Sequence, residues 1–128
     1  MQRAQRLRHA AEFGRVRERA GRGLAHPLLV LYAAPNDLDR TRVGITVSGR
    51  VGTAVVRNRA RRRLREALRQ RLARIEAGRD VVVVARPAIA SANWQAIGQA
   101  LDEVLKRARL LSGPNDRRTA TEAAAACV

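Results

Sequence analysis

The sequence has few of the side chains on which most enzyme active sites depend. Its 128 residues include one cysteine, two histidines and 11 acidic residues. Cys127 has no partner for an intramolecular disulfide, and its place in the tail argues against a nucleophile. His9 and His26 lack an acid–base partner nearby in the sequence, and the carboxylates do not follow the spacing of a metal site. We therefore predict no catalytic residue and no metal ligand in this chain.

Long apolar segments are also missing. The longest runs, such as the one within HPLLVLYAAPN, are far too short to span a bilayer. The basic N-terminus is not followed by the apolar region of a signal peptide. With a single cysteine, these features predict a soluble protein of the reducing cytoplasm with no membrane partner.

Aromatic side chains are limited to Phe13, Tyr32 and Trp94. This scarcity excludes a sheet that binds RNA through a platform of stacked rings. Trp94 lies on an apolar stripe of helical spacing, so we expect it in the core. For Phe13 and Tyr32, core packing and stacking on a single-stranded base both stay open.

Positive charge is what the sequence has in excess. The formal net charge is +15, and all of the 26 basic residues except Lys106 are arginine. A balance this basic predicts a polyanionic partner. The planar guanidinium pairs bidentately with phosphate and stacks on bases. A high-GC genome also favours arginine codons, so the preference over lysine has two open explanations.

Hydrophobic periodicity and turn residues predict alternating helices and strands. A basic arm, residues 1–8, precedes a short helix over 9–20. The predicted strands cover Leu28–Ala34, Arg42–Ser48 and Asp80–Pro87, the last of which is apolar enough to be covered on both faces. A long helix is expected from about Thr53 to Glu76, ended by Gly78.

A last helix, capped by Ser91 or Asn93, follows the third strand, and the polar segment 112–128 is expected to be a disordered tail. Residues 1–111 then form a single domain. The element order predicts an α+β or α/β sandwich, and the unit from Arg42 to Arg86 is expected to cross over in the right-handed sense.

The segment AVVRNRARRRLREALRQR, Ala54–Arg71, combines an apolar face with a dense arginine face. The expected core positions, at helical spacing, are Val56, Ala60, Leu64, Ala67, Leu68, Leu72 and Ile75. Arginines four residues apart repel each other, and cations at a helix start oppose its dipole. A bound polyanion offsets both effects, so the pattern favours nucleic-acid binding over a merely solvated face. DNA is disfavoured because neither a helix-turn-helix partner nor a dimer is visible.

A longer stretch, RVGITVSGRVGTAVVRNRARRRLREALR, resembles the signature of the protein component of bacterial ribonuclease P. In that signature a strand is followed by a Val-Gly turn, and Arg-Asn-Arg then stands at the start of an arginine-rich helix. The resemblance extends over residues 6–111. It implies an α+β fold in the order αβββαβα, with a four-stranded sheet and three helices, like a domain of ribosomal proteins. It also implies a left-handed βαβ crossover around the arginine helix, against the general rule.

The resemblance implies that an RNA subunit, with Mg²⁺, hydrolyses the phosphodiester bond that releases the 5′ leader of precursor tRNA. The protein would be a non-catalytic subunit with ribonuclease P RNA and the leader as partners and no obligate protein partner. The positions that match the family's RNA-subunit contacts are Arg57, Asn58, Arg59, Arg61, Arg62 and Arg65. Those that match its leader cleft are Phe13, Val16, Tyr32, Ser48 and Arg50.

Two departures from the family pattern affect the leader cleft. Arg17 stands where the family often has a second aromatic residue, and Gly49-Arg50 replaces a lysine pair. We therefore expect leader contacts that depend more on charge than on stacking. A structural RNA-binding protein without a part in cleavage, such as a ribosomal protein or an RNA chaperone, is the alternative. A DNA-compacting protein is a weaker one.

Overall fold

The computed structural model describes residues 6–7 and 10–111. Predictions for most of the basic arm, for His9 and for the tail with Cys127 lie outside these residues. The described elements are α1 (Ala10–Ala20), β1 (Leu24–Ala25), β2 (Leu29–Pro35), β3 (Arg42–Val47), α2 (Ala54–Arg71), β4 (Arg79–Ala85) and α3 (Trp94–Arg107). Short 3-10 turns, η2 (Gly49–Val51), η3 (Leu72–Arg74) and η4 (Pro87–Ser91), connect them. The order αβββαβα is confirmed.

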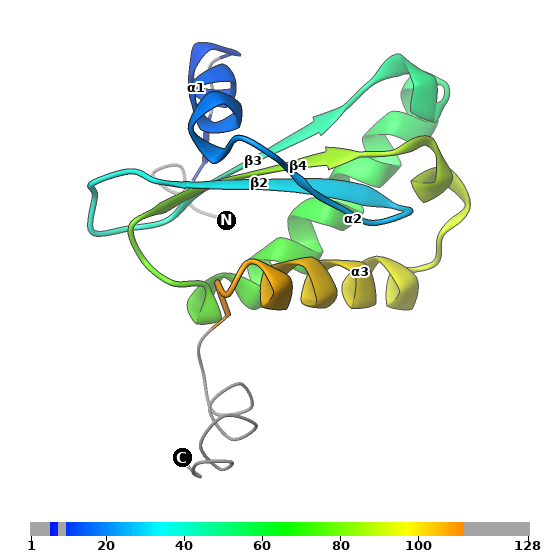
Figure 1. Ribbon diagram of the computed structural model, residues 1–128. Coiled ribbons are helices and arrows are strands. Elements are labelled where there is room, and N and C mark those ends of the chain that lie inside the picture. Colours follow the sequence, from blue (N-terminus) through cyan, green and yellow to red (C-terminus); the bar gives the residue numbers. More distant parts are fainter. Residues whose placement is uncertain (1–5, 8–9, 112–128) are drawn as a thin grey trace, which may run out of the picture.

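The four strands form one mixed sheet in the order β1-β2-β4-β3. Strand β2 pairs antiparallel with β4, and β3 pairs parallel with β4. Helix α1 lies on one face of the sheet, and α2 and α3 cover the other (Figure 1). The central strand β4 is therefore covered on both sides, which explains its valine run: Val81, Val82 and Val83 are all fully buried.

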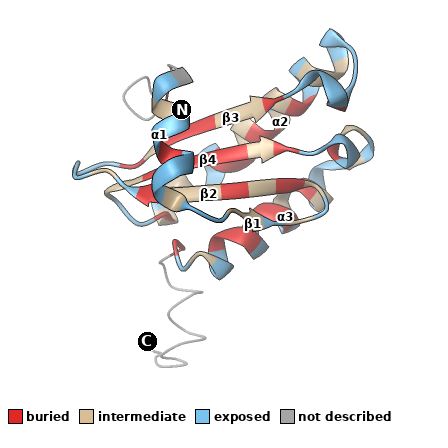
Figure 2. Cartoon of the chain, turned by 45° about the horizontal axis from the view of Figure 1, so that its top comes forward, coloured by how far each residue is buried: buried red, intermediate tan, exposed pale blue. Residues whose placement is uncertain are grey.

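The crossover from β3 through α2 to β4 is left-handed. Seen from the side of α1, both strands point to the right, β4 lies below β3, and α2 passes behind the sheet (Figure 2). The right-handed expectation from the general rule was wrong. Strand β4 inserts between β3 and β2, and the apolar residues of α2 belong to the large cluster shared with α3. Only a left-handed connection brings α2 to that face.

Helix α2 is shorter than predicted. It ends at Arg71, where the Leu72 N–H donates to the Arg69 carbonyl and tightens the chain into η3. Ile75 is buried but extended, and it bridges to Leu111 instead of completing a helical stripe. Gly78 has a φ of 84° in the turn before β4, so it does not cap the helix.

The start of α3 corrects two further expectations. Asn93 is the cap, since its side-chain oxygen accepts from the Ala96 N–H at 2.8 Å, whereas Ser91 lies within η4. Trp94 is 41% exposed and not in the core. Side chains on a helix tilt toward its N-terminus, so the first residue projects past the part of α3 that packs on the sheet. The buried stripe of α3 begins at Ile97.

Candidate RNA-binding surface

The start and the rotation of α2 are set by local contacts. Thr53 is its cap, with the side-chain oxygen accepting from the Val56 N–H at 3.4 Å. At Gly52, φ is 155° and an added Cβ would lie 2.9 Å from the Val56 side chain, so only glycine fits this turn. The residues that turn the apolar face to the core are Ala60, Leu64, Ala67 and Leu68. Because this face is buried, the arginines are directed outward and to the flanks.

Three arginines of α2 are engaged in contacts within the protein. Arg63 Nη1 donates to the Ala92 carbonyl at 3.2 Å. Arg69 pairs with Glu66 one turn earlier. Arg71 Nε donates to Asp102 Oδ1 at 2.6 Å, and its side chain is 14% exposed. These residues stabilise the helix and its packing on α3, and they are not available to a ligand without loss of those bonds.

The remaining positions form what we call the arginine face: Arg57, Asn58, Arg59, Arg61, Arg62 and Arg65. Within the part of the chain that the structure describes, Arg57, Arg59, Arg62 and Arg65 make no hydrogen bond or ion pair. Arg61 donates to the Asn58 side-chain oxygen at 2.9 Å. The structure thus brings together all six residues predicted to face the RNA subunit, and leaves four guanidinium groups open to solvent or a partner.

An open groove of about 510 Å³ runs beside the arginine face, which we call the β3 groove. Its lining comes from α1, β3 and α2: Phe13, Gly14, Arg17, Ile45, Thr46, Val47 and Arg61. The Phe13 ring covers Gly44 so closely that a Cβ there would lie 2.6 Å from it. A second hollow of about 320 Å³, also bounded by Phe13 and Arg61, extends to Arg65. Arg61 therefore belongs to both the groove and the arginine face.

The residues predicted to contact the leader are only partly gathered here. Phe13 lines the β3 groove, and Ser48 and Arg50 are exposed just after Val47. Tyr32 lies on the same sheet face, with the Arg17 guanidinium carbon 5.1 Å from its ring centroid. Val16 is 3% exposed and packs among the small cluster beneath α1, so it offers almost no surface to a ligand.

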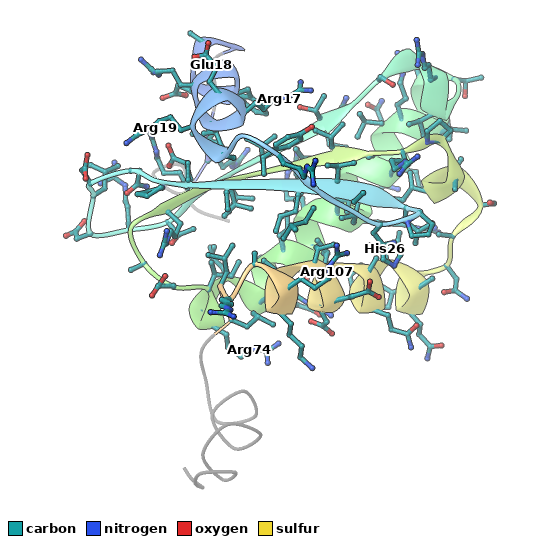
Figure 3. The ribbon with its side chains drawn as sticks, in the orientation of Figure 1. Arg17, Glu18, Arg19, His26, Arg74 and Arg107 are labelled. Carbon is teal, nitrogen blue, oxygen red and sulfur yellow. The ribbon has the colours of Figure 1, made fainter. Side chains whose placement is uncertain are left out.

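Arg17 lines the β3 groove but is not among the predicted leader contacts, although the sequence already shows it as a departure from the family pattern. In Figure 3 it projects from α1 over the sheet, whereas its neighbour Glu18 points away. A sequence signal was available, because Phe13 and Arg17 are four residues apart and share one side of a helix. The position that the family often fills with an aromatic ring here places a cation beside Tyr32.

The acidic residues near these surfaces serve as partners of arginines. Burial disfavours the charged form of Asp80, but hydrogen bonds from Arg42 and Asn36 outweigh it and lower the pKa of this carboxyl. The hydrogen bond from Arg69 lowers the pKa of Glu66. Within residues 6–7 and 10–111, no three His, Cys, Asp or Glu side chains are grouped to hold a metal ion. Nor is any helix of the described chain both long and apolar enough to cross a membrane.

Comparisons with known proteins agree on one family. The family model "Ribonuclease P" matches residues 1–109. The ribonuclease P protein component of Herpetosiphon aurantiacus is 47% identical over 110 residues, which cover 86% of this chain and 89% of that protein. That of Chloroflexus aurantiacus is 44% identical over 117 residues, covering 91% of this chain and 86% of the other.

Solved structures give the same result. The RNase P protein of Staphylococcus aureus superimposes with a TM-score of 0.78 at 32% identity, covering 86% of this chain and all of that one. The Thermotoga maritima RNase P protein gives a TM-score of 0.71 at 29% identity, covering 80% and 96%. Sequence, fold and the arginine helix therefore place this chain in the family of ribonuclease P protein components.

Proposed function

We propose that this protein binds the RNA subunit of ribonuclease P through the arginine face and holds the single-stranded 5′ leader of precursor tRNA in the β3 groove. The observation that carries the proposal is the set of four guanidinium groups on one helix, those of Arg57, Arg59, Arg62 and Arg65, that make no hydrogen bond or ion pair with the described residues. As precursor tRNA is made in the bacterial cytoplasm, we place the activity there.

Electrostatics support an RNA partner for the arginine face. No acidic residue occurs between Ser48 and Arg65, so the first turns of α2 carry uncompensated positive charge. Each pair of arginines four residues apart costs a few tenths of a kcal/mol, and the helix dipole adds to the cost. The phosphates of a folded RNA attract both the arginines and the positive end of the helix dipole, so binding offsets both costs. Arginine also pairs bidentately with phosphate oxygens, which gives the contact a defined orientation.

The β3 groove fits a single strand better than a duplex. It is bounded by an aromatic ring, Phe13, and by two cations, Arg17 and Arg61. An unpaired base can lie against the ring while the backbone passes the guanidinium groups, and such contacts tolerate different base sequences. With one aromatic ring and two arginines in the lining, charge contributes more to leader binding than stacking does.

The chemistry in this proposal belongs to the RNA subunit and its Mg²⁺, which supply the activated water and the stabilisation of the leaving oxygen. Several carboxylates of the described chain are engaged with arginines, among them Asp80 with Arg42 and Asp102 with Arg71. The protein's own part is to neutralise phosphate repulsion between the two RNAs and to orient the leader. Both effects lower the concentration of Mg²⁺ that the RNA subunit needs.

The test is cleavage of precursor tRNA by a bacterial ribonuclease P RNA at low Mg²⁺, with and without the protein. We expect the protein to lower the Mg²⁺ requirement and to bind precursor tRNA more tightly than mature tRNA when assembled with the RNA subunit. A control reaction at high Mg²⁺ shows that the RNA is competent. If the protein binds RNA but changes neither quantity, a structural RNA-binding role replaces the proposal.

A further inference from the structure

Trp94 is an exposed aromatic side chain beside the arginine helix that the proposed function does not use. It is the only tryptophan of the chain and is 41% exposed at the first position of α3. Arg63 of α2 donates to the carbonyl of Ala92, two residues before it. We propose that Trp94 stacks on an unpaired nucleobase of the RNA subunit, which extends the RNA-binding surface from α2 onto the start of α3. This inference rests on the proposed function.

The fold gives Trp94 no structural task that would explain it. The core stripe of α3 begins at Ile97, and Asn93 already caps the helix. Among the described residues, no cation–π pair involves its ring; the single such pair is between Arg17 and Tyr32. An indole is one of the largest apolar surfaces a residue can bury, so leaving 41% of Trp94 exposed forgoes part of that stabilisation.

The surroundings of Trp94 are complementary to a polyanion. The segments Ser48–Arg65 and Val81–Leu101 contain no acidic residue. They meet where η2, η4 and the starts of α2 and α3 gather, at the right-hand end of Figure 1. The first carboxylates beyond them, Glu66 and Asp102, are paired with arginines. Aromatic rings near arginines bind bases by stacking without reading sequence.

Geometry favours the RNA subunit over the leader as the source of this base. Arg61 lines the β3 groove, whereas Arg63 reaches the start of α3. Two residues correspond to about 200° around a helix, so these arginines lie on opposite flanks of α2. A leader in the groove would have to cross the arginine face to reach Trp94. A folded RNA seated on that face contacts the α3 flank directly.

The first test uses the tryptophan fluorescence of the full-length protein, excited at a wavelength that tyrosine does not absorb, because Trp94 is the chain's single tryptophan. Titration with ribonuclease P RNA should quench the emission in proportion to complex formation, and high salt should restore it. Titration with a single-stranded leader oligonucleotide should leave the emission nearly unchanged. A shift on raising protein concentration without RNA would assign Trp94 to a protein contact and overturn the inference.

The second test compares Trp94→Leu, which keeps apolar bulk, with Trp94→Phe, which keeps a ring. The leucine variant should bind the RNA subunit about 5- to 150-fold more weakly, the range for one lost base–aromatic stack. The phenylalanine variant should recover most of that loss. The salt dependence should stay as in the wild type, because no charge is removed. Leu38→Ala, which truncates an exposed apolar side chain of the β2–β3 loop, is the matched control and should have no effect.

The outcomes separate the inference from the proposed function. If wild-type protein binds labelled RNA subunit but its fluorescence does not change, and Trp94→Leu binds equally well, the stacking inference is wrong and the proposed function stands. If the wild type does not bind the RNA subunit at all, the proposed function has failed. Circular dichroism of Trp94→Leu, with its exposed site, is expected to match the wild type.

Discussion

Arg42 and Asp80 face each other across the parallel strands β3 and β4 and form two side-by-side hydrogen bonds. Arg42 Nε lies 2.9 Å from Asp80 Oδ1, and Nη2 lies 2.7 Å from Oδ2. Arg42 Nη1 also reaches Glu12 Oε2 on α1 at 3.2 Å. One guanidinium thus connects the sheet to the helix that forms a wall of the β3 groove.

The link from Arg42 to Glu12 predicts an effect on leader binding. Glu12→Gln should loosen α1 and reduce discrimination between precursor and mature tRNA by about two- to fivefold, the range for a partly exposed ion pair. Affinity for the RNA subunit alone should not fall. The measurement is the equilibrium binding of both tRNAs to the assembled holoenzyme.

Glu18→Gln is the control for that variant. It removes the same charge from the same helix, but Glu18 is exposed and points away from the sheet. Any general gain in RNA affinity from the added positive charge therefore appears in both variants. Equal discrimination in the two would show that apolar packing around Val16, and not the ion pair, positions α1.

Asp80 predicts how stability depends on pH. Its pKa is lowered from the ordinary value of 3.8, so the folded state holds a proton more weakly than the unfolded chain. The resulting stability is complete above that value and is lost as the pH falls through the folded-state pKa. Asp80→Asn should cost roughly 1.5–3 kcal/mol at neutral pH, because it weakens charged hydrogen bonds.

Urea unfolding of both proteins from about pH 7 to about pH 3 checks this. The difference in unfolding free energy between wild type and Asp80→Asn should shrink toward the acid end, because protonation then removes the charge from the wild type too. Other carboxylates affect both proteins equally and cancel in the difference. A gap that does not change with pH would mean that the Asp80 charge does not contribute through its ion pair.

The local features of this fold were predictable, and the non-local ones were not. Periodicity located α2 and its buried leucines, because the helical repeat acts over a few residues. The predicted helix extended too far, as far as Ile75. Ile75 is buried in either conformation: here it is extended and pairs with Leu111, but a further helical turn would have buried the same side chain. Periodicity also placed Trp94 in the core, because it does not show where the covering sheet ends.

The same distinction applies to the candidate site. The arginine face follows from spacing on one helix, so the structure brings together all six predicted residues. The β3 groove depends on how α1, β3 and α2 meet, which spacing alone does not give. Resemblance to the family assigned Phe13 and Tyr32 to the leader cleft, but it also included the buried Val16 and named Arg17 only as a departure from the family pattern.

Unpaired arginines predict the salt dependence of RNA binding. Arg62→Ala should weaken binding of the RNA subunit and reduce the slope of log K against log salt by about 0.7–0.9, the value for one lost phosphate contact. Arg69→Ala removes the same charge from the same helix, but Arg69 is paired with Glu66, so its slope should change less. Filter binding at several salt concentrations measures both. Identical slopes for the two variants would indicate diffuse charge attraction and not defined phosphate contacts.

Close packing of Phe13 on Gly44 predicts that the groove is sensitive to a single methyl group. A Cβ at position 44 would lie 2.6 Å from the Phe13 ring, so Gly44→Ala must displace the ring. Overpacking of this kind costs about 1–3 kcal/mol, and the moved ring should also weaken leader binding. Gly14→Ala is the control for stability alone, since Gly14 also lines the β3 groove; a Cβ there meets nothing within 4 Å and replaces a helical glycine. That change should stabilise α1 by about 0.5–1 kcal/mol. Thermal unfolding and precursor-tRNA binding of both variants test the prediction, and a Gly44→Ala protein as stable as wild type would show that Phe13 is not seated on β3.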